Sequence, residues 1–208
     1  NYLKEVFKEI RKNKALCIMD EVQTGFGRVG NNFWSFHEHG VVPDVVTLGK
    51  PMGNGHPIAA VITTEKIASV FNNGMEYFNS FGGNPVSCAV GKAVLEVIEK
   101  EKLQQNALDT GKYFLKKLQH IKNKNKKYIS EVRGRGLFLG IDIIQESNKL
   151  RPNKQLAKKI INFMRENGIL LSTDGPYDNV IKIKPPLLFN KDNVDNVCKN
   201  LEIFFKKI

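Results

Sequence analysis

The chain has 208 residues and an ordinary globular composition, with 41% hydrophobic and 25% charged residues. That length is enough for one large domain, or a domain and a half, with a substantial buried core. No apolar run approaches the roughly 20 residues that a membrane-spanning helix needs, which argues against a membrane protein. The net charge of +11 lies in residues 101–208, because residues 1–100 carry equal numbers of acidic and basic side chains.

Much of the positive excess falls in one lysine-rich stretch, residues 122–127, between two periodic segments. A basic half could attract nucleic acid or phosphorylated metabolites. No aromatic residue alternates with these lysines, so we interpret the stretch as a solvated loop and expect no nucleic-acid partner.

The three cysteines, Cys17, Cys88 and Cys198, lie far apart, each inside an apolar segment. Their spacing predicts neither a metal site nor a disulfide framework. We expect buried, reduced thiols in an intracellular protein, either cytoplasmic or mitochondrial.

Helix-like and strand-like segments alternate over the first hundred residues. Apolar residues at three- and four-residue spacing predict an amphipathic helix over 2–12. Short, fully apolar runs predict buried strands at 15–19, 45–48 and 58–62. Helical segments are expected at 32–39 and from residue 64. This alternation predicts a mostly parallel sheet with helices on its faces.

The second part of the chain has a different order of elements. A clear helical period begins at Pro85, a residue that suits a first helical turn. Further helices are expected at 102–121, 154–166 and 192–206, and strands at 137–144, 169–171 and 180–184. Such an order is typical of an α+β domain, with the helix from Pro85 as the bridge.

Two side chains that could take part in catalysis lie at the ends of predicted strands. Lys50 follows the apolar run 44–48 and precedes a glycine-rich turn, and Asp20 ends the apolar run 15–19. Open α/β sheets bind ligands at the carboxyl ends of their strands, where both side chains are expected. A lysine that forms a Schiff base with an aldehyde, and a carboxylate that keeps a pyridine nitrogen protonated, are what a pyridoxal-phosphate (PLP) enzyme needs. The alternatives are a solvated lysine, and an aspartate that caps the next turn or pairs with Arg28.

A third candidate is the stretch 79–85, which holds Ser80, two glycines and the predicted helix start at Pro85. Backbone N–H groups and the serine hydroxyl could bind a phosphate there. The alternative is a tight turn before a helix.

In order and spacing, these motifs resemble the class III, or subgroup II, PLP-dependent aminotransferase family. The resemblance rests on residues 20–28, 43–44, 50, 81–85, 132–137 and 184–187. It implies an α/β fold of type I: the C-terminal part of the PLP-binding large domain (1–85), a bridging helix (86–100) and an α+β small domain (101–208). It also implies a homodimer with the active site at the interface.

The resemblance implies roles for five residues. Lys50 matches the Schiff-base lysine and Asp20 the residue that binds the pyridine nitrogen. Gln23 matches the residue near the ring 3-hydroxyl, and Ser80 a threonine that reaches the cofactor phosphate of the neighbouring subunit. Lys182 aligns with an arginine that clamps a substrate carboxylate. A lysine is a point charge and makes no flat bidentate pair. Lys182 is therefore either a substrate-binding residue of another kind or an exposed strand residue.

Residues 49–57 and 74–79 resemble the branch of phospho-lyases that act on ethanolamine phosphate and phosphohydroxylysine. This implies a carbon–oxygen lyase that eliminates phosphate from a phosphorylated amine, giving an aldehyde, ammonia and phosphate. The alternatives are a class III omega-aminotransferase that uses a keto acid, and a non-catalytic binding or dimerisation module. Complete family members are longer, so we expect this chain to be an incomplete enzyme whose upstream half supplies the phosphate loop and a stacking ring.

Overall fold

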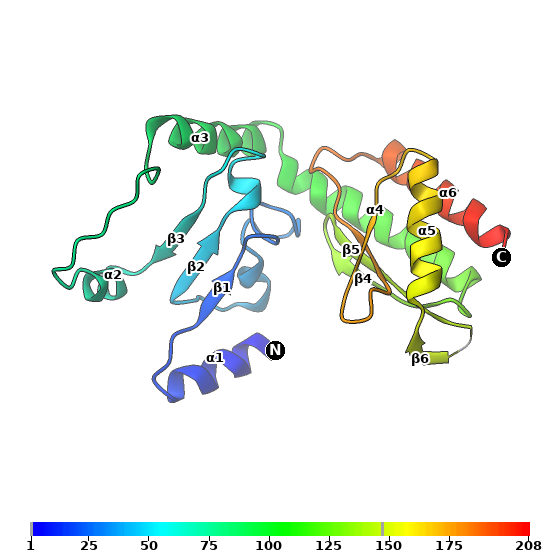
Figure 1. Cartoon of the computed structure of the whole chain (residues 1–208), viewed down its shortest axis with the longest axis horizontal. Helices are drawn as coiled ribbons and strands as arrows, with labels where there is room; N and C mark the ends of the chain where they lie inside the picture. The colour runs from blue at the N-terminus through cyan, green and yellow to red at the C-terminus, as the bar shows by residue number, and fades with distance from the viewer. Residues whose placement is uncertain (1, 147) are drawn as a thin grey trace. The chain divides into compact units, whose positions relative to one another are not determined.

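The computed structural model describes residues 2–146 and 148–208. The chain divides into two compact units, of which the first ends at Gln104 and the second begins at Gln105 (Figure 1). Both units combine helices and strands, in agreement with the predicted α/β class. Among the described residues, no helix has both the length and the apolar character that crossing a bilayer requires. The three-part division at 85 and 100 stays a prediction.

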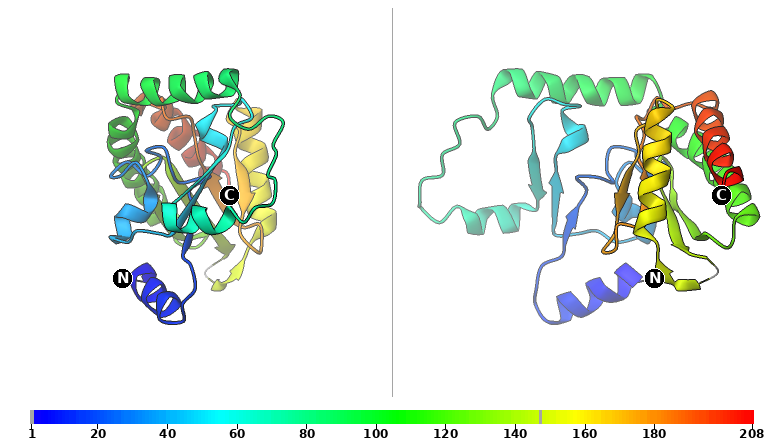
Figure 2. Two further views of the ribbon diagram at one scale, coloured as in Figure 1. Left: turned by 90° about the vertical axis from the view of Figure 1, so that its left-hand side faces the viewer. Right: turned by 45° about the vertical axis from the view of Figure 1, so that its right-hand side comes forward.

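The first unit is built on a three-stranded sheet in the order β1-β2-β3. Its elements are α1 (Tyr2–Lys12), β1 (Ile18–Asp20), the 3-10 helix η1 (Ser35–His39), β2 (Val45–Leu48), the 3-10 helix η2 (Lys50–Met52), β3 (Ala60–Thr63), α2 (Glu65–Phe71) and α3 (Pro85–Lys100). An extended segment leads from α2 back to α3 (Figures 1 and 2).

Strands β1 and β2 are parallel, as predicted, but β3 runs antiparallel to β2. The prediction of a mostly parallel sheet is therefore wrong for β3. A parallel return needs a long crossover, usually a helix. The connection over 49–59 contains only the short η2 helix, so the chain reverses direction.

The two faces of this sheet are covered differently. Met19 and Val46 pack against a small core that includes Phe7 of α1. On the other face Ile18 and Val61 expose 61% and 67% of their surface. The prediction of fully buried strands is wrong here, because the helices among the described residues leave this face open. The register places Asp20 on the same face as Ile18.

The second unit contains an antiparallel sheet in the order β4-β5-β8-β7, with β6 paired to β5. Its elements are α4 (Leu103–Lys124), which begins just before the boundary, β4 (Ile129–Arg135), β5 (Phe138–Gln145), β6 (Asn148–Pro152), α5 (Lys154–Glu166), β7 (Ser172–Asp174), β8 (Val180–Ile183) and α6 (Lys191–Lys206). One core joins the helices α4, α5 and α6 to alternate residues of the sheet, among them Ile141 and Ile181.

The predicted helices of this unit agree well with the structure, but two strands differ. Strand β4 has no predicted counterpart. Its buried residues Ile129 and Val132 are three apart because the register shifts between Ile129 and Glu131, which hides the two-residue period of a strand. The predicted strand 169–171 lies before β7, and Leu170 is exposed.

The cysteines are free thiols, as predicted, but they are not all buried. Cys17 and Cys198 are buried and Cys88, on α3, is exposed. Desolvation by burial raises the pKa of Cys17 and raises the pKa of Cys198 to about 12, so the latter thiol stays protonated at neutral pH.

A close approach of α4 to the turn between β4 and β5 gives a test of the second unit. A Cβ atom on Gly111 would overlap the carbonyl group of Gly136. Gly111→Ala would ordinarily stabilise a helix by about 1 kcal/mol. Here we expect it to lower the free energy of unfolding by about 1–3 kcal/mol, because backbone must move. Denaturant unfolding measures this, with the exposed Lys112→Ala as control; a higher midpoint for Gly111→Ala would contradict the packing.

Candidate functional site

The carboxyl ends of β1 and β2 lie side by side in the first unit (Figure 1). The register pairs Asp20 with Thr47, and the N–H of Glu21 donates to the carbonyl oxygen of Thr47 at 3.0 Å. Strand β2 ends at Leu48, and Lys50 begins η2. Asp20 and Lys50 therefore emerge at the same edge of a parallel pair, which is where such sheets bind ligands.

Asp20 presents one available carboxylate oxygen. Its Oδ1 accepts a hydrogen bond from the backbone N–H of Val22 at 2.9 Å, which is the turn-capping contact considered as the alternative. Among residues 2–146 and 148–208, Oδ2 receives no hydrogen bond. The side chain is exposed, on the uncovered face of the sheet. This oxygen can accept a hydrogen bond from a ligand.

Lys50 has an unusual backbone and a free amine. Its φ of 32° is positive, which is uncommon for a residue with a side chain and costs on the order of 1 kcal/mol. The turn is closed by the N–H of Met52, which donates to the carbonyl oxygen of Gly49 at 2.9 Å. Within the described part of the chain, the exposed amine forms no hydrogen bond or ion pair. Backbone strain of this kind often accompanies a functional position.

Glu21 is the residue that our sequence reasoning missed. It is fully buried. Its Oε1 accepts hydrogen bonds from the hydroxyl of Ser35 at 2.7 Å and the N–H of Phe36 at 3.0 Å. Its Oε2 accepts from the hydroxyl of Thr24 at 3.1 Å and the N–H of Ser35 at 3.0 Å. Glu21 thus ties the segment after β1 to the start of η1 and fixes the backbone next to Asp20.

Gln23 and Ser80 lie on separate segments of the first unit. Gln23 is an exposed residue of the turns that follow β1. Ser80 lies in the exposed loop between α2 and α3. The side chain of Asn79 accepts hydrogen bonds from the N–H groups of Phe81 at 3.1 Å and Gly82 at 2.9 Å, so a tight turn surrounds Ser80.

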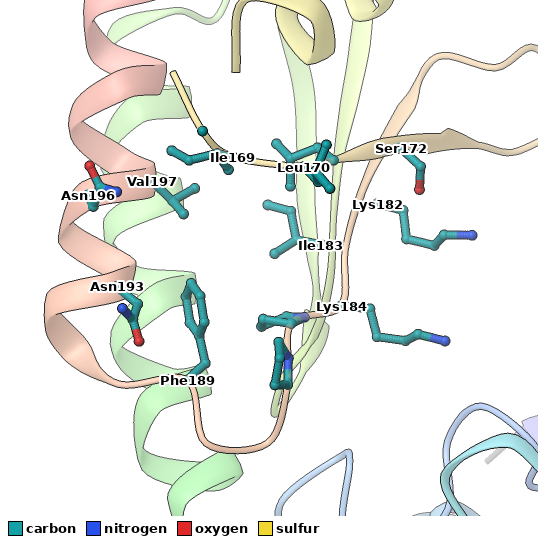
Figure 3. A pocket seen from close by; sticks show the side chains of 14 residues that line it. Ile169, Leu170, Ser172, Lys182, Ile183, Lys184, Phe189, Asn193, Asn196 and Val197 are labelled. Atoms are coloured by element: carbon teal, nitrogen blue, oxygen red, sulfur yellow. The ribbon is translucent and has the colours of Figure 1, made fainter. Parts of the chain in front are cut away.

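Lys182 belongs to the second unit and lies on β8, on the sheet face away from the helices. Its Nζ donates to Asp174 Oδ2 at 2.8 Å, and this hydrogen bond lowers the pKa of Asp174 from its usual value. The side chain is half-buried, which differs from the alternative of an exposed strand residue. It is among the residues that line a pocket of about 590 Å³. The side chains of Lys182 and Lys184 extend to the same side, beside Ser172 and away from Asn193 (Figure 3).

Comparison with known proteins identifies the family. Residues 1–205 match the aminotransferase class-III family. The chain is 48% identical over 196 residues to "Alanine--glyoxylate aminotransferase 2-like" of Drosophila melanogaster, covering 93% of this chain and 40% of that protein. It is 43% identical over 197 residues to "Ethanolamine-phosphate phospho-lyase homolog 1" of Caenorhabditis elegans, covering 93% of this chain and 42% of that protein.

A solved structure of a similar protein has the same fold. A phospholyase from Arthrobacter in complex with phosphoethanolamine superposes with a TM-score of 0.96 at 44% identity, over 100% of this chain and 49% of that one. The chain belongs to the class-III aminotransferase family, and it spans less than half the length of these relatives.

The family's cofactor is pyridoxal phosphate. The residues at the β1–β2 edge fit this group. Lys50 offers an amine that has no partner among the residues the structure describes, and Asp20 offers an acceptor oxygen on the sheet face that the described helices leave open. These are the two functional groups that a PLP site requires from one strand edge.

Removing the carboxylate of Glu21 tests whether its hydrogen bonds stabilise the backbone that follows β1. Glu21→Ala leaves the part-buried N–H group of Ser35 and the buried N–H group of Phe36 without their acceptor. We expect a loss of about 3 kcal/mol in the free energy of unfolding, since each unsatisfied buried donor costs about 1–3 kcal/mol. Glu21→Gln, which keeps one carbonyl oxygen, should lose less. Denaturant unfolding measures both, with the exposed Glu9→Ala as control; an unchanged midpoint for Glu21→Ala would contradict the assignment.

Proposed function

We propose that this chain forms the C-terminal part of a PLP-dependent phospho-lyase that eliminates phosphate from a phosphorylated amine such as ethanolamine phosphate. The observation that carries the proposal is the likeness, over the whole chain, to a phospholyase whose structure holds phosphoethanolamine. The positions of Lys50 and Asp20 at one strand edge support the cofactor.

Four residues of the first unit would serve the cofactor. Pyridoxal phosphate, when bound, supplies a sink for the electron pair left on a substrate carbon after proton loss. Asp20 Oδ2 would accept the N–H of the ring nitrogen and keep it protonated. Lys50 Nζ would hold the cofactor in the resting enzyme. Gln23 would lie near the ring hydroxyl, and Ser80 Oγ would donate to the cofactor phosphate of the neighbouring subunit.

Lys50 has a second role as general base. When the substrate amine takes its place, the freed Nζ would remove the proton from the carbon that bears nitrogen. Phosphate would then leave from the adjacent carbon with the bonding electron pair. In sum, ethanolamine phosphate and one water give acetaldehyde, ammonia and inorganic phosphate. No keto acid is consumed, which distinguishes this reaction from amino transfer.

A lysine at position 182, in place of an arginine, is compatible with a phosphorylated substrate. An arginine there would grip a carboxylate through two parallel N–H groups. Lys182 offers a single ammonium group, which already donates to Asp174. This arrangement is poorly suited to clamping an α-carboxylate but can attract a phosphate as a point charge.

A homodimer is part of the proposal, and its support comes from the loop that carries Ser80. Met75 and Phe81 in this loop expose 80% and 82% of their surface, and Tyr77 and Phe78 are also exposed. Several large apolar side chains exposed on one loop are typical of an interaction surface. An intracellular location, cytoplasmic or mitochondrial, accords with relatives from Arabidopsis thaliana and Homo sapiens whose names include "mitochondrial".

The second candidate is a class III omega-aminotransferase. It is favoured by the likeness to the Drosophila melanogaster protein, at 48% identity. Lys50 and Asp20 would serve both reactions, since elimination and amino transfer begin with loss of the same proton.

Phosphate release distinguishes the two candidates. The complete protein, incubated with ethanolamine phosphate and no keto acid, should release inorganic phosphate and ammonia in equal amounts. Lys50→Ala should abolish release, and Asp20→Asn should slow it by about a hundredfold or more, within the range that a positioned acid or base contributes. The exposed Lys8→Ala serves as the matched control. Strict dependence on pyruvate or 2-oxoglutarate would contradict the lyase and favour the aminotransferase.

A further inference from the structure

A chain of hydrogen bonds joins the lysine segment to the loop that carries Ser80. His56 Nε2 lies 2.8 Å from Ser87 Oγ. The side-chain amide of Asn84 donates to Ser87 Oγ at 2.9 Å and to the carbonyl oxygen of Phe81 at 2.7 Å. Asn84 Oδ1 accepts from the N–H of Ser87 at 2.9 Å, which caps α3. The four residues form one connected network across the first unit.

The turn after η2 directs His56 toward α3. A Cβ atom on Gly53 would overlap the carbonyl oxygen of His56, so this position requires glycine. Asn54 and Gly55 have positive φ values of 46° and 105°, and the N–H of His56 donates to the carbonyl oxygen of Gly53 at 3.0 Å. This backbone turns the chain back on itself directly after the lysine segment.

The segment that contains η2 and the turn after it packs against one face of helix α3. Ser87 and Gly91 are one helical turn apart, and both are buried. A Cβ on Gly91 would lie 3.3 Å from Ile58 Cδ1 and 3.9 Å from the carbonyl oxygen of Met52, so α3 packs closely on η2 (Figure 1). The glycine permits this close apolar contact, and the His56–Ser87 pair adds a directional one.

At the other end of the network, Ser80 lies between two asparagines that hold the turn. Asn79 binds the N–H groups of Phe81 and Gly82, and Asn84 binds the carbonyl oxygen of Phe81. The position of Asn84 depends on Ser87, and the side chain of Ser87 depends on His56. A path of hydrogen bonds therefore leads from His56 to the turn around Ser80.

We propose that His56 is a positioning residue that acts through Ser87 and Asn84. It fixes the turn around Ser80 relative to the Lys50 segment, and so it strengthens the binding of the cofactor phosphate. This inference rests on the proposed function, in which Ser80 contacts that phosphate. It assigns to His56 no contact with substrate or cofactor.

The contribution of the phosphate group to cofactor affinity can be measured apart from catalysis. The complete apoprotein is titrated with pyridoxal 5′-phosphate and with pyridoxal, which lacks the phosphate, and the ratio of the two dissociation constants is compared between variants. His56→Leu should reduce the preference for the phosphorylated form by about three- to tenfold, the factor that one net hydrogen bond contributes. Affinity for pyridoxal should stay within about twofold. His56→Gln, which keeps a hydrogen-bonding nitrogen, should retain most of the preference.

Three further variants separate this inference from the proposed function. Ser80→Ala should reduce the preference at least as much as His56→Leu, and the double variant should lose nothing more, because both act through one contact. Ser87→Ala removes the link between His56 and Asn84 and should match His56→Leu. This variant decides the matter if His56→Leu does not fold.

The outcomes are distinct. If Ser80→Ala reduces the preference while His56→Leu and Ser87→Ala do not, or if these two weaken both ligands equally, the positioning role is overturned and the proposed function stands. If Ser80→Ala leaves the preference unchanged, the role of Ser80 in the proposed function fails, and the role of His56 fails with it.

Discussion

The parallel pairing of β1 with β2 is the constraint on which the rest of the site depends. Its register places Asp20 opposite Thr47, on the sheet face that the described helices leave open, and brings Lys50 to the same edge. A slip of one residue would turn Asp20 to the face that packs on α1. The hydrogen bonds of the buried Glu21 hold the backbone that follows β1, so the register and the direction of Asp20 are supported together.

The sequence predicts those parts of the site that follow from local rules. Lys50 and Asp20 could be placed because each directly follows a short apolar run, and parallel strands end at a common edge. Glu21 and His56 could not be assigned, because their partners Ser35 and Ser87 are distant in the chain. Strand β4 was hidden by a bulge, and the open face of β1 could not be foreseen because apolar runs are expected to be covered.

The first unit exposes apolar side chains on two surfaces. One is the sheet face with Ile18 and Val61, and the other is the loop with Met75 and Phe81. The chain spans less than half the length of its relatives. The hydrogen-bond network from His56 to Asn84 links the lysine segment to that loop.

The central claim is that Lys50 attaches the cofactor at the β1–β2 edge. Borohydride reduction of the complete protein with pyridoxal phosphate, followed by peptide mapping, tests it most directly. We expect a stable pyridoxyl label on Lys50 that is absent in Lys50→Ala and unchanged in Lys8→Ala. A label on another lysine, or no retained cofactor at all, would contradict the account; the second result would favour a non-catalytic module.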